Sequence, residues 1–300
     1  MQQKPRYIAV IGPTASGKSA LAIRLAQALA GELINCDSVQ FYRGFDIGSA
    51  KPDAAEQALV PHHLWDLLEP HQEFDAREFA VRAESVVQEV LARGKRPLLV
   101  GGTGLYLRAL WQEKWHDLPK SEPLRAELSQ LSIEDLRTRL EAKDPERARA
   151  IHPNDRFRLQ RALEISTLLG HPIHELPPAA GRRHEAFVIR VQCERSLLHE
   201  RIAKRTEQML QSGFIEEVED LLKAGVSPSA KPMQSIGYRE VCAFLQGDLA
   251  REQLAEAIII ATRQYAKRQE TWFRSVEENV VWHEGCDWLS WLEEIRRVFG

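Results

Sequence analysis

Short apolar runs alternate with longer amphipathic stretches over the first hundred residues. The apolar runs have the length and composition of buried strands, and the stretches between them repeat apolar residues at helical spacing. The second stretch opens with Asp75 and Glu78, which form a capping box. Strands and helices in this order predict an α/β core with a parallel sheet. The predicted strands are 6–11, 31–37 and 97–102, and the predicted helices are 20–30 and 75–93.

The pattern changes between about residue 115 and residue 185, where short and highly charged helical segments follow one another. An apolar strand pattern then returns at 187–192, so the core resumes after an all-helical insertion. Further helices follow at 196–212, 214–224 and 248–275, and a strand and a closing helix are predicted within 279–300. The acidic amphipathic helix 214–224 is predicted to serve packing. The resulting segments are 1–115 for the first part of the core, 116–185 for the insertion, and 186–300 for the second part with a basic C-terminal helix.

Composition narrows the class of protein. Of 300 residues, 44% are apolar and 28% charged, as in an ordinary globular protein. No apolar run approaches the length of a membrane span and the N-terminus lacks a signal peptide, so we expect a soluble, cytoplasmic protein without membrane contact. The four cysteines form no Cys-x-x-Cys pair and are expected to be reduced.

Charge argues against a protein that coats nucleic acid indiscriminately, because the net charge is −3. The basic residues are nevertheless uneven. They crowd the insertion and the long C-terminal helix, which leaves room for a local basic face. The two groups are Arg147, Arg149, Arg156, Arg158 and Arg161, and Arg263, Lys267, Arg268 and Arg274.

The loop after the first strand has the spacing of a phosphate-binding loop. Gly12, Gly17, Lys18 and Ser19 fill the pattern G-x-x-x-x-G-K-[ST], between a strand and a helix. In this motif backbone N–H groups turn toward an anion, the lysine reaches the outer phosphate, and the hydroxyl of Ser19 holds Mg²⁺. Together with the sheet, the motif predicts a P-loop NTPase-like α/β fold with an all-helical insertion domain.

The residues at two strand ends indicate which kind of phosphate compound the loop binds. Asp37 follows the second strand, at the edge of an α/β sheet where ligands bind. The third strand ends in Gly101 and Gly102, where enzymes that attack a γ-phosphate usually carry an acid. The phosphates therefore need not belong to a nucleoside triphosphate. A helix face with Arg201 and Arg205 requires an anion, which solvent or a diphosphate could supply.

Seven segments, in order along nearly the whole chain, resemble the bacterial tRNA dimethylallyltransferases, also called tRNA isopentenyltransferases. Ser49 stands where threonine is common in that family, and the hydroxyl is kept. The segments are Gly12–Ser19, Asp37–Gln40 with Tyr42, Asp46–Pro52, Gly101–Tyr106, Arg158–Glu164, Ile236–Arg239 and Thr262–Gln269.

The resemblance implies transfer of a dimethylallyl group from dimethylallyl diphosphate to the N6 amine of the adenine 3′ of the anticodon, in tRNAs that read codons beginning with U. It implies that Asp37 is the general base, that Thr14 contacts the oxygen at the scissile bond, and that Arg205 grips the diphosphate. The loop Gly12, Pro13, Thr14, Ala15, Ser16, Gly17, Lys18 and Ser19 would bind that diphosphate with Mg²⁺.

Contacts with the tRNA anticodon stem-loop are also implied, and one copy of the chain would suffice to enclose it. Ser38, Gln40 and Thr103 would frame the adenine. For the charged residues of the insertion, a solvated helix face is the competing interpretation. The further candidates for tRNA contact are Val39, Arg125, Arg158, Gln160, Arg161, Gln234, Gly237, Arg239, Arg263 and Lys267, with Asp37 itself.

Three alternatives stay open at this point. The acceptor could be a free adenine nucleotide, although a mononucleotide needs no basic insertion. A P-loop small-molecule kinase would consume ATP, and the strand that ends in Gly101 and Gly102 argues against it. A non-catalytic RNA-binding protein would bind tRNA without turnover, and the combination of Lys18, Ser19 and Asp37 argues against that.

Overall fold

The computed structural model describes residues 5–112, 118–176, 186–277 and 280–299. The chain divides into two compact units. The first comprises Met1–Trp111 and Arg183–Gly300, and the second is Gln112–Arg182. The predicted boundaries at 115/116 and 185/186 lie outside the described residues.

The first unit is built on a six-stranded parallel sheet with the order β3-β2-β4-β1-β5-β6. β1 therefore lies inside the sheet, paired with β4 on one side and β5 on the other. All five of its residues are buried, as expected for a strand covered on both faces. The strands are β1 (Tyr7–Ile11), β2 (Gly31–Cys36), β3 (His62–His63), β4 (Arg96–Gly101), β5 (Ala186–Val191) and β6 (Val280–Trp282).

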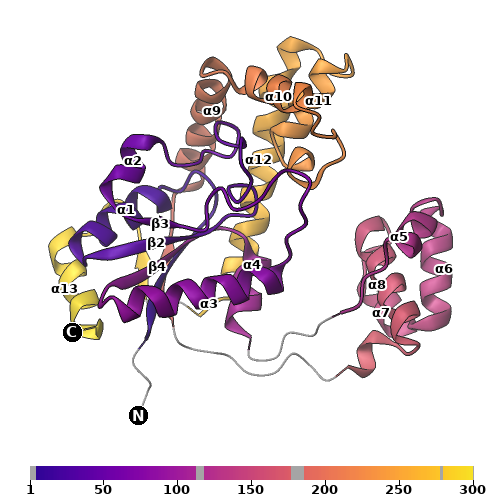
Figure 1. The fold of residues 1–300 in the computed structure, drawn as a ribbon, viewed down its shortest axis with the longest axis horizontal. Coiled ribbons are helices and arrows are strands. Elements are labelled where there is room, and N and C mark those ends of the chain that lie inside the picture. Colours follow the sequence, from indigo (N-terminus) through magenta and orange to yellow (C-terminus); the bar gives the residue numbers. More distant parts are fainter. Residues whose placement is uncertain (1–4, 113–117, 177–185, 278–279, 300) are drawn as a thin grey trace. The chain divides into compact units, whose positions relative to one another are not determined.

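Helices cover the sheet (Figure 1). α1 (Lys18–Ala28) and α13 (Trp288–Phe299) pack on one face, where Ile8 and Val10 meet Leu25 and Ile295 in the main apolar core. Successive strand residues point to opposite faces, so Ala9 and its equivalents face the other way. There α3 (Ala76–Ala92) packs against β2 and β4, with α4 (Gly104–Trp111) beside it.

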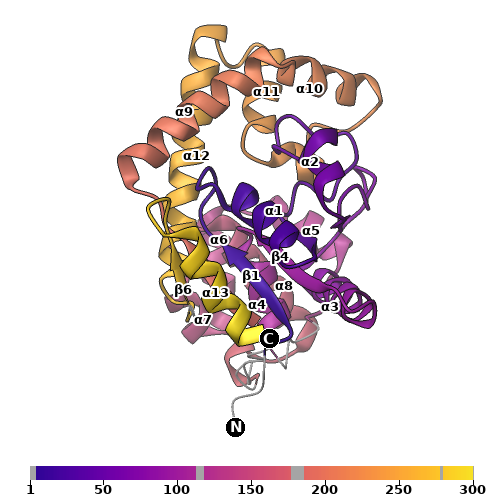
Figure 2. The same ribbon diagram turned by 90° about the vertical axis from the view of Figure 1, so that its left-hand side faces the viewer.

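The remaining helices of this unit follow β5. α9 and α12 lie side by side in both ribbon views, and α10 and α11 join them (Figures 1 and 2). This helical layer supplies one wall of the site described below. Its elements are α9 (Arg195–Gln211), α10 (Phe214–Lys223), η2 (Lys231–Gln234), α11 (Tyr238–Leu245) and α12 (Arg251–Phe273).

The named secondary-structure elements of the second unit are all helices. Ser121, Ser132, Asp144 and Asp155 cap its four α-helices through side-chain hydrogen bonds. A small apolar core joins them, with Leu136, Leu140 and Leu159 fully buried. The elements are α5 (Glu122–Ser129), α6 (Ile133–Lys143), α7 (Pro145–Ala150), α8 (Arg156–Leu169) and η1 (Ile173–Glu175).

Three helices were not predicted from the sequence: α2 (Ala54–Leu59), α4 and α11. α4 begins inside the glycine-rich segment that reads as a loop. Glycine at position 104 is needed there, because a Cβ would lie 2.6 Å from the Trp272 ring. Tertiary packing thus overrides the weak helix propensity of glycine. None of the described helices has both the length and the apolar character that spanning a bilayer requires.

The core of the second unit gives a stability prediction. Leu140→Ala should lower the free energy of unfolding of this unit by about 2–5 kcal/mol, because it leaves a cavity among fully buried side chains. Leu168→Ala is the matched control, since Leu168 lies on α8 with 40% of its surface exposed. Denaturant-dependent hydrogen exchange of peptides from residues 122–176 measures both variants in the full chain. Equal losses for the two would contradict this assignment of the core.

Candidate active site

Residues 12–17 join β1 to α1 in a tight loop at the carboxyl end of the sheet, and Lys18 and Ser19 begin α1. Gly17 caps α1 in the left-handed region, with φ of 88°. Ala15 also lies there, with φ of 61°, a conformation that costs a non-glycine residue about 1 kcal/mol or more. Lys18 folds back and donates from Nζ to the carbonyl of Pro13 at 3.2 Å. The loop is therefore closed around its own lysine.

Ser16 carries an unused polar group in this loop. Its side chain is buried, and its Oγ has no hydrogen-bond partner within the described part of the chain. Gly12 lies against it, since a Cβ at Gly12 would be 3.0 Å from that Oγ and 2.9 Å from the carbonyl of Val191. Buried polar groups normally find a partner, so the loop fits an anion that accepts from this hydroxyl.

Asp37 is held by its neighbours at the end of β2. Its backbone N–H donates to Oδ1 of Asn35 at 2.9 Å, and its Oδ1 accepts from the N–H of Val39 at 3.0 Å. Asn35 is itself buried and donates to the carbonyl of Leu64 at 3.1 Å. The Asp37 carboxylate thus has a fixed direction, and it borders both cavities described next.

A cavity of about 250 Å³ lies between the loop ends of the sheet and the helical layer. Its polar lining includes Thr14, Asp37 and Arg205, which come from the loop after β1, the end of β2 and α9. Its apolar lining comes from the helical layer, from the segment around residue 236, and from Val39 in the loop after β2. The apolar side chains are Val39, Ile202, Met209, Phe214, Ile236 and Ile258.

A second, more polar cavity of about 60 Å³ lies on the other side of these groups. Lys18, Ser19 and Asn35 contribute to it. The two cavities share four lining residues, so Thr14, Asp37, Arg205 and Ser49 form the boundary between them. A molecule placed at this boundary would have a charged, loop-lined space on one side and a largely apolar space on the other.

Two cations and a carboxylate interact at this boundary. Burial lowers the pKa of Lys18 to about 8; the nearby negative charge of Asp37 opposes that shift and the positive charge of Arg205 adds to it. Burial also lowers the pKa of Arg205, against the effect of Asp37. These shifts show positive charge that is poorly solvated. A multiply charged anion would relieve that cost.

The site also fits magnesium. The hydroxyl of Ser19 and the carboxylate of Asp37 both line the second cavity, and hard oxygen donors of this kind suit Mg²⁺. The described residues contain no group of three or more His, Cys, Asp or Glu side chains that could hold a metal by themselves. Mg²⁺ bound by few protein oxygens together with substrate phosphates is the arrangement that these residues permit.

The loop at 46–49 forms one wall of the larger cavity and is fixed by Glu217 of α10. The Glu217 carboxylate accepts from the N–H groups of Asp46, Ile47 and Gly48 at 3.1, 2.6 and 3.2 Å. It also accepts from the Tyr238 hydroxyl at 2.7 Å. Burial raises the pKa of Tyr238, so this hydroxyl stays protonated and donates.

Glycine is required within this wall. A Cβ at Gly48 would lie 2.1 Å from the Phe214 ring and 2.7 Å from the Tyr238 ring. Both rings line the same cavity. The loop therefore approaches the aromatic side chains as closely as its backbone allows.

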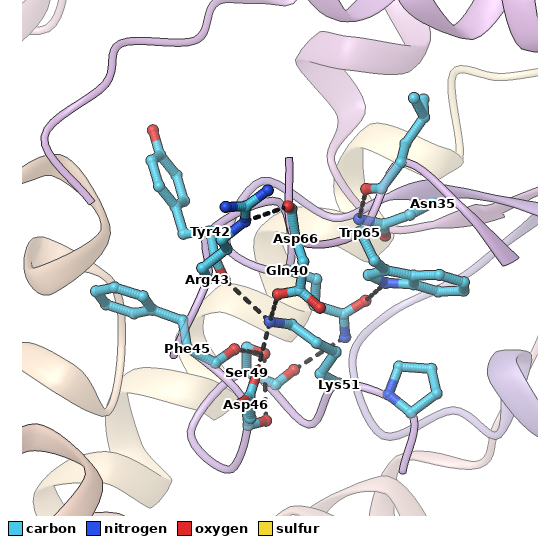
Figure 3. Close-up of polar contacts among 12 residues, drawn as sticks. Asn35, Gln40, Tyr42, Arg43, Phe45, Asp46, Ser49, Lys51, Trp65 and Asp66 are labelled. Atoms are coloured by element: carbon cyan, nitrogen blue, oxygen red, sulfur yellow. Dashed lines mark hydrogen bonds and ion pairs between the residues drawn. The ribbon is translucent and has the colours of Figure 1, made fainter. Parts of the chain in front are cut away.

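Polar side chains from residues 40–66 also hold this loop (Figure 3). The Lys51 side chain is only 3% exposed, and its Nζ contacts the carboxylates of Asp46 and Asp66 at 2.5 and 2.6 Å. Gln40 donates to the carbonyls of Ser49 and Ala50 at 3.0 and 3.1 Å and accepts from Trp65 Nε1 at 3.0 Å (Figure 3). These contacts fix the position of Ser49 at the boundary of the cavities.

The residues predicted to frame the adenine have different surroundings. Ser38 and Val39 line the larger cavity. The Gln40 side chain is bound to the loop wall instead and borders the smaller cavity. The Thr103 hydroxyl accepts from the Ser38 N–H at 3.2 Å and lies close enough to Tyr265 to oppose the rise that burial causes in its pKa, so Thr103 serves the framework of the site.

Predicted tRNA contacts of the first unit are spread along its helical layer. Gln234 and Gly237 line the larger cavity, and Gln234 donates to the carbonyl of Pro228 at 2.8 Å. Arg239 pairs with the adjacent Glu240 at 2.6 Å. Arg263 and Lys267 lie on α12, where Lys267 is exposed. Their contact with RNA stays a prediction.

In the second unit, part of the predicted basic face is used internally. Arg125 and Arg161 both pair with the buried carboxylate of Glu164, at 2.9 and 2.5 Å. Gln160 donates to the carbonyl of Arg125 at 3.2 Å. Arg158 differs, because its side chain is 70% exposed and pairs only at the surface, with Asp155 at 3.2 Å. Arg158 is therefore the most accessible of the four predicted contacts.

Sequence reasoning missed several residues that shape the site: Asn35, Glu217, Tyr265 and Gln269. Asn35 is a polar residue within an apolar strand, two positions before Asp37, and this was a usable signal. Glu217 belongs to a helix that was predicted to serve packing only. Nothing in its local sequence separates it from the exposed acids around it.

Comparison with known proteins agrees with the resemblance found in the sequence. A family model described as IPP transferase matches residues 40–276. The tRNA dimethylallyltransferase of Geobacter metallireducens is 43% identical over 290 residues, which make up 94% of each protein. A tRNA dimethylallyltransferase 1 of Pelobacter propionicus is 44% identical over 292 residues, 93% of each protein.

Solved structures give the same result. The crystal structure of a tRNA delta(2)-isopentenylpyrophosphate transferase from Staphylococcus epidermidis matches with a TM-score of 0.71 at 35% identity and covers 99% of both chains. A eukaryotic dimethylallyltransferase acting on tRNA matches with a TM-score of 0.72 at 27% identity over 89% of this chain and 69% of that one. The predicted P-loop-like α/β fold is confirmed. The chain belongs to the tRNA dimethylallyltransferase family and is a prenyltransferase enzyme.

Proposed function

We propose that this enzyme transfers the dimethylallyl group of dimethylallyl diphosphate to the N6 amine of the adenine 3′-adjacent to the anticodon, in tRNAs that read codons beginning with U. The observation that carries the proposal is the meeting of the two cavities at Thr14, Asp37 and Arg205. A diphosphate fits the polar side of this boundary, and a prenyl group and a flat base fit the apolar side. The family relationship favours this reaction over the kinase and the free-nucleotide enzyme.

The leaving group sets the first requirement. Cleavage of the C–O bond leaves negative charge on the diphosphate, and cations fixed beforehand stabilise that charge as it develops. Lys18 and Arg205 supply the positive charge from a poorly solvated position, as their lowered pKa values indicate. We assign the oxygen at the scissile bond to Thr14, the loop residue that borders both cavities. Mg²⁺ bound by Ser19 would supply further positive charge to the phosphates.

The nucleophile sets the second requirement. The exocyclic amine of adenine is a weak nucleophile, and it carries a proton that must leave as the new C–N bond forms. Asp37 can accept this proton, because its carboxylate is held beside the cations by Asn35 and the Val39 N–H. The pair of electrons from the amine forms the bond to carbon, and the C–O bond electrons leave with the diphosphate.

A tRNA acceptor is supported by exposed groups as well as by the family. The base must leave the anticodon loop to reach the cavity, at a cost of a few kcal/mol. Contacts elsewhere with the anticodon stem-loop would offset it. In the second unit, Phe157 and Arg158 are consecutive, exposed residues of α8 (79% for Phe157 and 70% for the Arg158 side chain), and aromatic rings and guanidinium groups are both suited to contact with RNA. Because the lining of both cavities comes from one copy, we propose that a monomer acts, in the cytoplasm where tRNA is found.

The direct test uses purified enzyme, Mg²⁺, labelled dimethylallyl diphosphate and unmodified tRNA. We expect label on the adenine 3′ of the anticodon, located by nuclease digestion and mass spectrometry, and none on AMP offered instead. Transfer to AMP alone would move the acceptor to free nucleotides. ATP consumption without transfer would indicate a kinase.

Asp37→Asn should lower kcat by about 10²- to 10⁴-fold, because it removes the general base and keeps the size of the side chain. The affinity for tRNA should change by about twofold or less. Asp220→Asn is the matched control, as Asp220 is exposed on α10 in a surface pair with Lys223. Single-turnover transfer assays and filter binding measure the two quantities. An Asp37→Asn enzyme as fast as the control would exclude Asp37 as the base.

Lys18 makes donor binding depend on pH. Its lowered pKa of about 8 means that it loses its positive charge as the pH rises through about 8, so the affinity for dimethylallyl diphosphate should fall above that pH. Ionisation of the donor itself contributes little to this pH dependence, because its last phosphate ionisation lies near pH 6. Titration calorimetry without tRNA, from about pH 7 to about pH 9.5, measures the trend.

The control for this trend is Lys18→Met. It should bind the donor weakly at every pH in that range, because it has no charge to lose. Wild-type affinity that stays constant across pH 8 would show that Lys18 does not titrate where its burial places it.

A further inference from the structure

One buried glutamine joins the phosphate-binding loop to the end of β4. Gln269, on α12, accepts from the Thr14 N–H at its Oε1 (2.8 Å) and donates from Nε2 to the carbonyl of Gly102 (2.9 Å). Its side chain is 6% exposed. The side chain must supply an acceptor and a donor at once, since one partner is a donor and the other an acceptor, and the glutamine amide does so at every pH. The bond partners also fix which way the amide faces.

The phosphate-binding loop also packs against α9 and α12 through Ala15. Ala15, in its strained left-handed conformation, packs against the small apolar cluster of Leu198, Ile202 and Ala266. Ala266 lies on α12, three residues before Gln269. One face of α12 thus contacts two consecutive residues of the loop. The bond to Thr14 stabilises a conformation that would otherwise be costly.

The same helix face reaches the Asp37 side of the site. Tyr265 lies one turn before Gln269 and close to Thr103, which opposes the rise that burial causes in the pKa of Tyr265. The Thr103 hydroxyl accepts from the Ser38 N–H. Ser38 follows Asp37 directly. Residues four apart on a helix project from one face. α12 therefore contacts the residue proposed to meet the leaving oxygen and, through Thr103, the residue next to the proposed base.

Close packing explains both glycines at the end of β4, and Gln269 explains the second. A Cβ at Gly101 would lie 2.3 Å from the carbonyl oxygen of Cys36, and a Cβ at Gly102 would lie 2.2 Å from Gln269 Nε2. Where many P-loop enzymes carry an acid, this chain has a backbone carbonyl that accepts from Gln269. Gly102 therefore helps to hold the phosphate-binding loop, through its bond with Gln269.

We propose that Gln269 is a positioning residue of the transfer reaction: it sets the place of Thr14 relative to Asp37 through its paired hydrogen bonds to Thr14 and Gly102. It touches neither substrate by this account. Because the Thr14 N–H is used by Gln269, the Thr14 side chain and not its amide is the group that faces the diphosphate. The inference rests on the proposed function, since it assigns geometry to that reaction.

Gln269→Met is the first test, because it keeps the length and removes both hydrogen bonds. We expect kcat to fall by about 10- to 100-fold, the cost of a misplaced reacting group, with KM for tRNA within about twofold of wild type. Gln264→Met is the matched control, on the same helix at an exposed position. A Gln269→Met enzyme with wild-type kcat would overturn the proposal.

Gln269→Glu distinguishes positioning from simple packing. A protonated glutamic acid can accept from Thr14 and donate to Gly102 as the glutamine does, whereas the carboxylate cannot donate. Burial raises the pKa of such a group. The ratio of the Gln269→Glu rate to the wild-type rate should therefore rise as the pH falls from about 8 to about 6. A ratio independent of pH would overturn the proposal, even if Gln269→Met fails to fold.

A readout without catalysis separates this inference from the proposed function. Hydrogen exchange of peptides that cover residues 12–18 should be faster in Gln269→Met than in wild type and in Gln264→Met. If wild type transfers no prenyl group but the exchange differs, the proposed function fails and the loop contact stands. If wild type transfers and neither exchange nor rate differs, the inference about Gln269 fails alone.

Discussion

Poorly solvated positive charge is the constraint on which the site depends. Lys18 and Arg205 are placed where burial lowers the pKa of both, and Asp37 is the carboxylate of the described chain that acts on each. Such an arrangement costs free energy in the absence of a bound anion, because desolvation penalises the charged form. Binding of a diphosphate would recover that cost, and more charge appears on the same group when the C–O bond breaks. The same electrostatic arrangement therefore suits both donor binding and catalysis.

Charges in such a place must be held, and much of the polar sequence around the site serves that purpose. Glu217 orients the loop at 46–48, Lys51 lies between two carboxylates, and Gln40 holds the backbone of Ser49 and Ala50. The buried side chain of this set is that of Lys51, whose ammonium would lack a charged partner without its two carboxylates. Few polar side chains at the boundary of the cavities are available to contact substrate. Thr14, Asp37 and Arg205 are the three that we assign to it.

The second unit shows the same distinction on a basic surface. The family resemblance implies that Arg125 and Arg161 contact tRNA, and in the structure both pair with the buried Glu164. A buried carboxylate needs such partners. Arg158 and Phe157 extend into solvent on the same helix. Burial therefore separates arginines that stabilise the helical unit from those that are available to a partner.

The sequence by itself determined the phosphate-binding loop, the order of most strands and helices, and the family. These rest on local signals: the spacing of Gly12, Gly17, Lys18 and Ser19, the period of apolar residues, and caps such as Asp75. Only the tertiary structure decided how the loop is held. Thr14 and Gln269 are 255 residues apart in the chain, and Asp46 and Glu217 are 171 apart. A buried glutamine and an exposed one look alike in a helical pattern, because their difference arises from what packs against the helix.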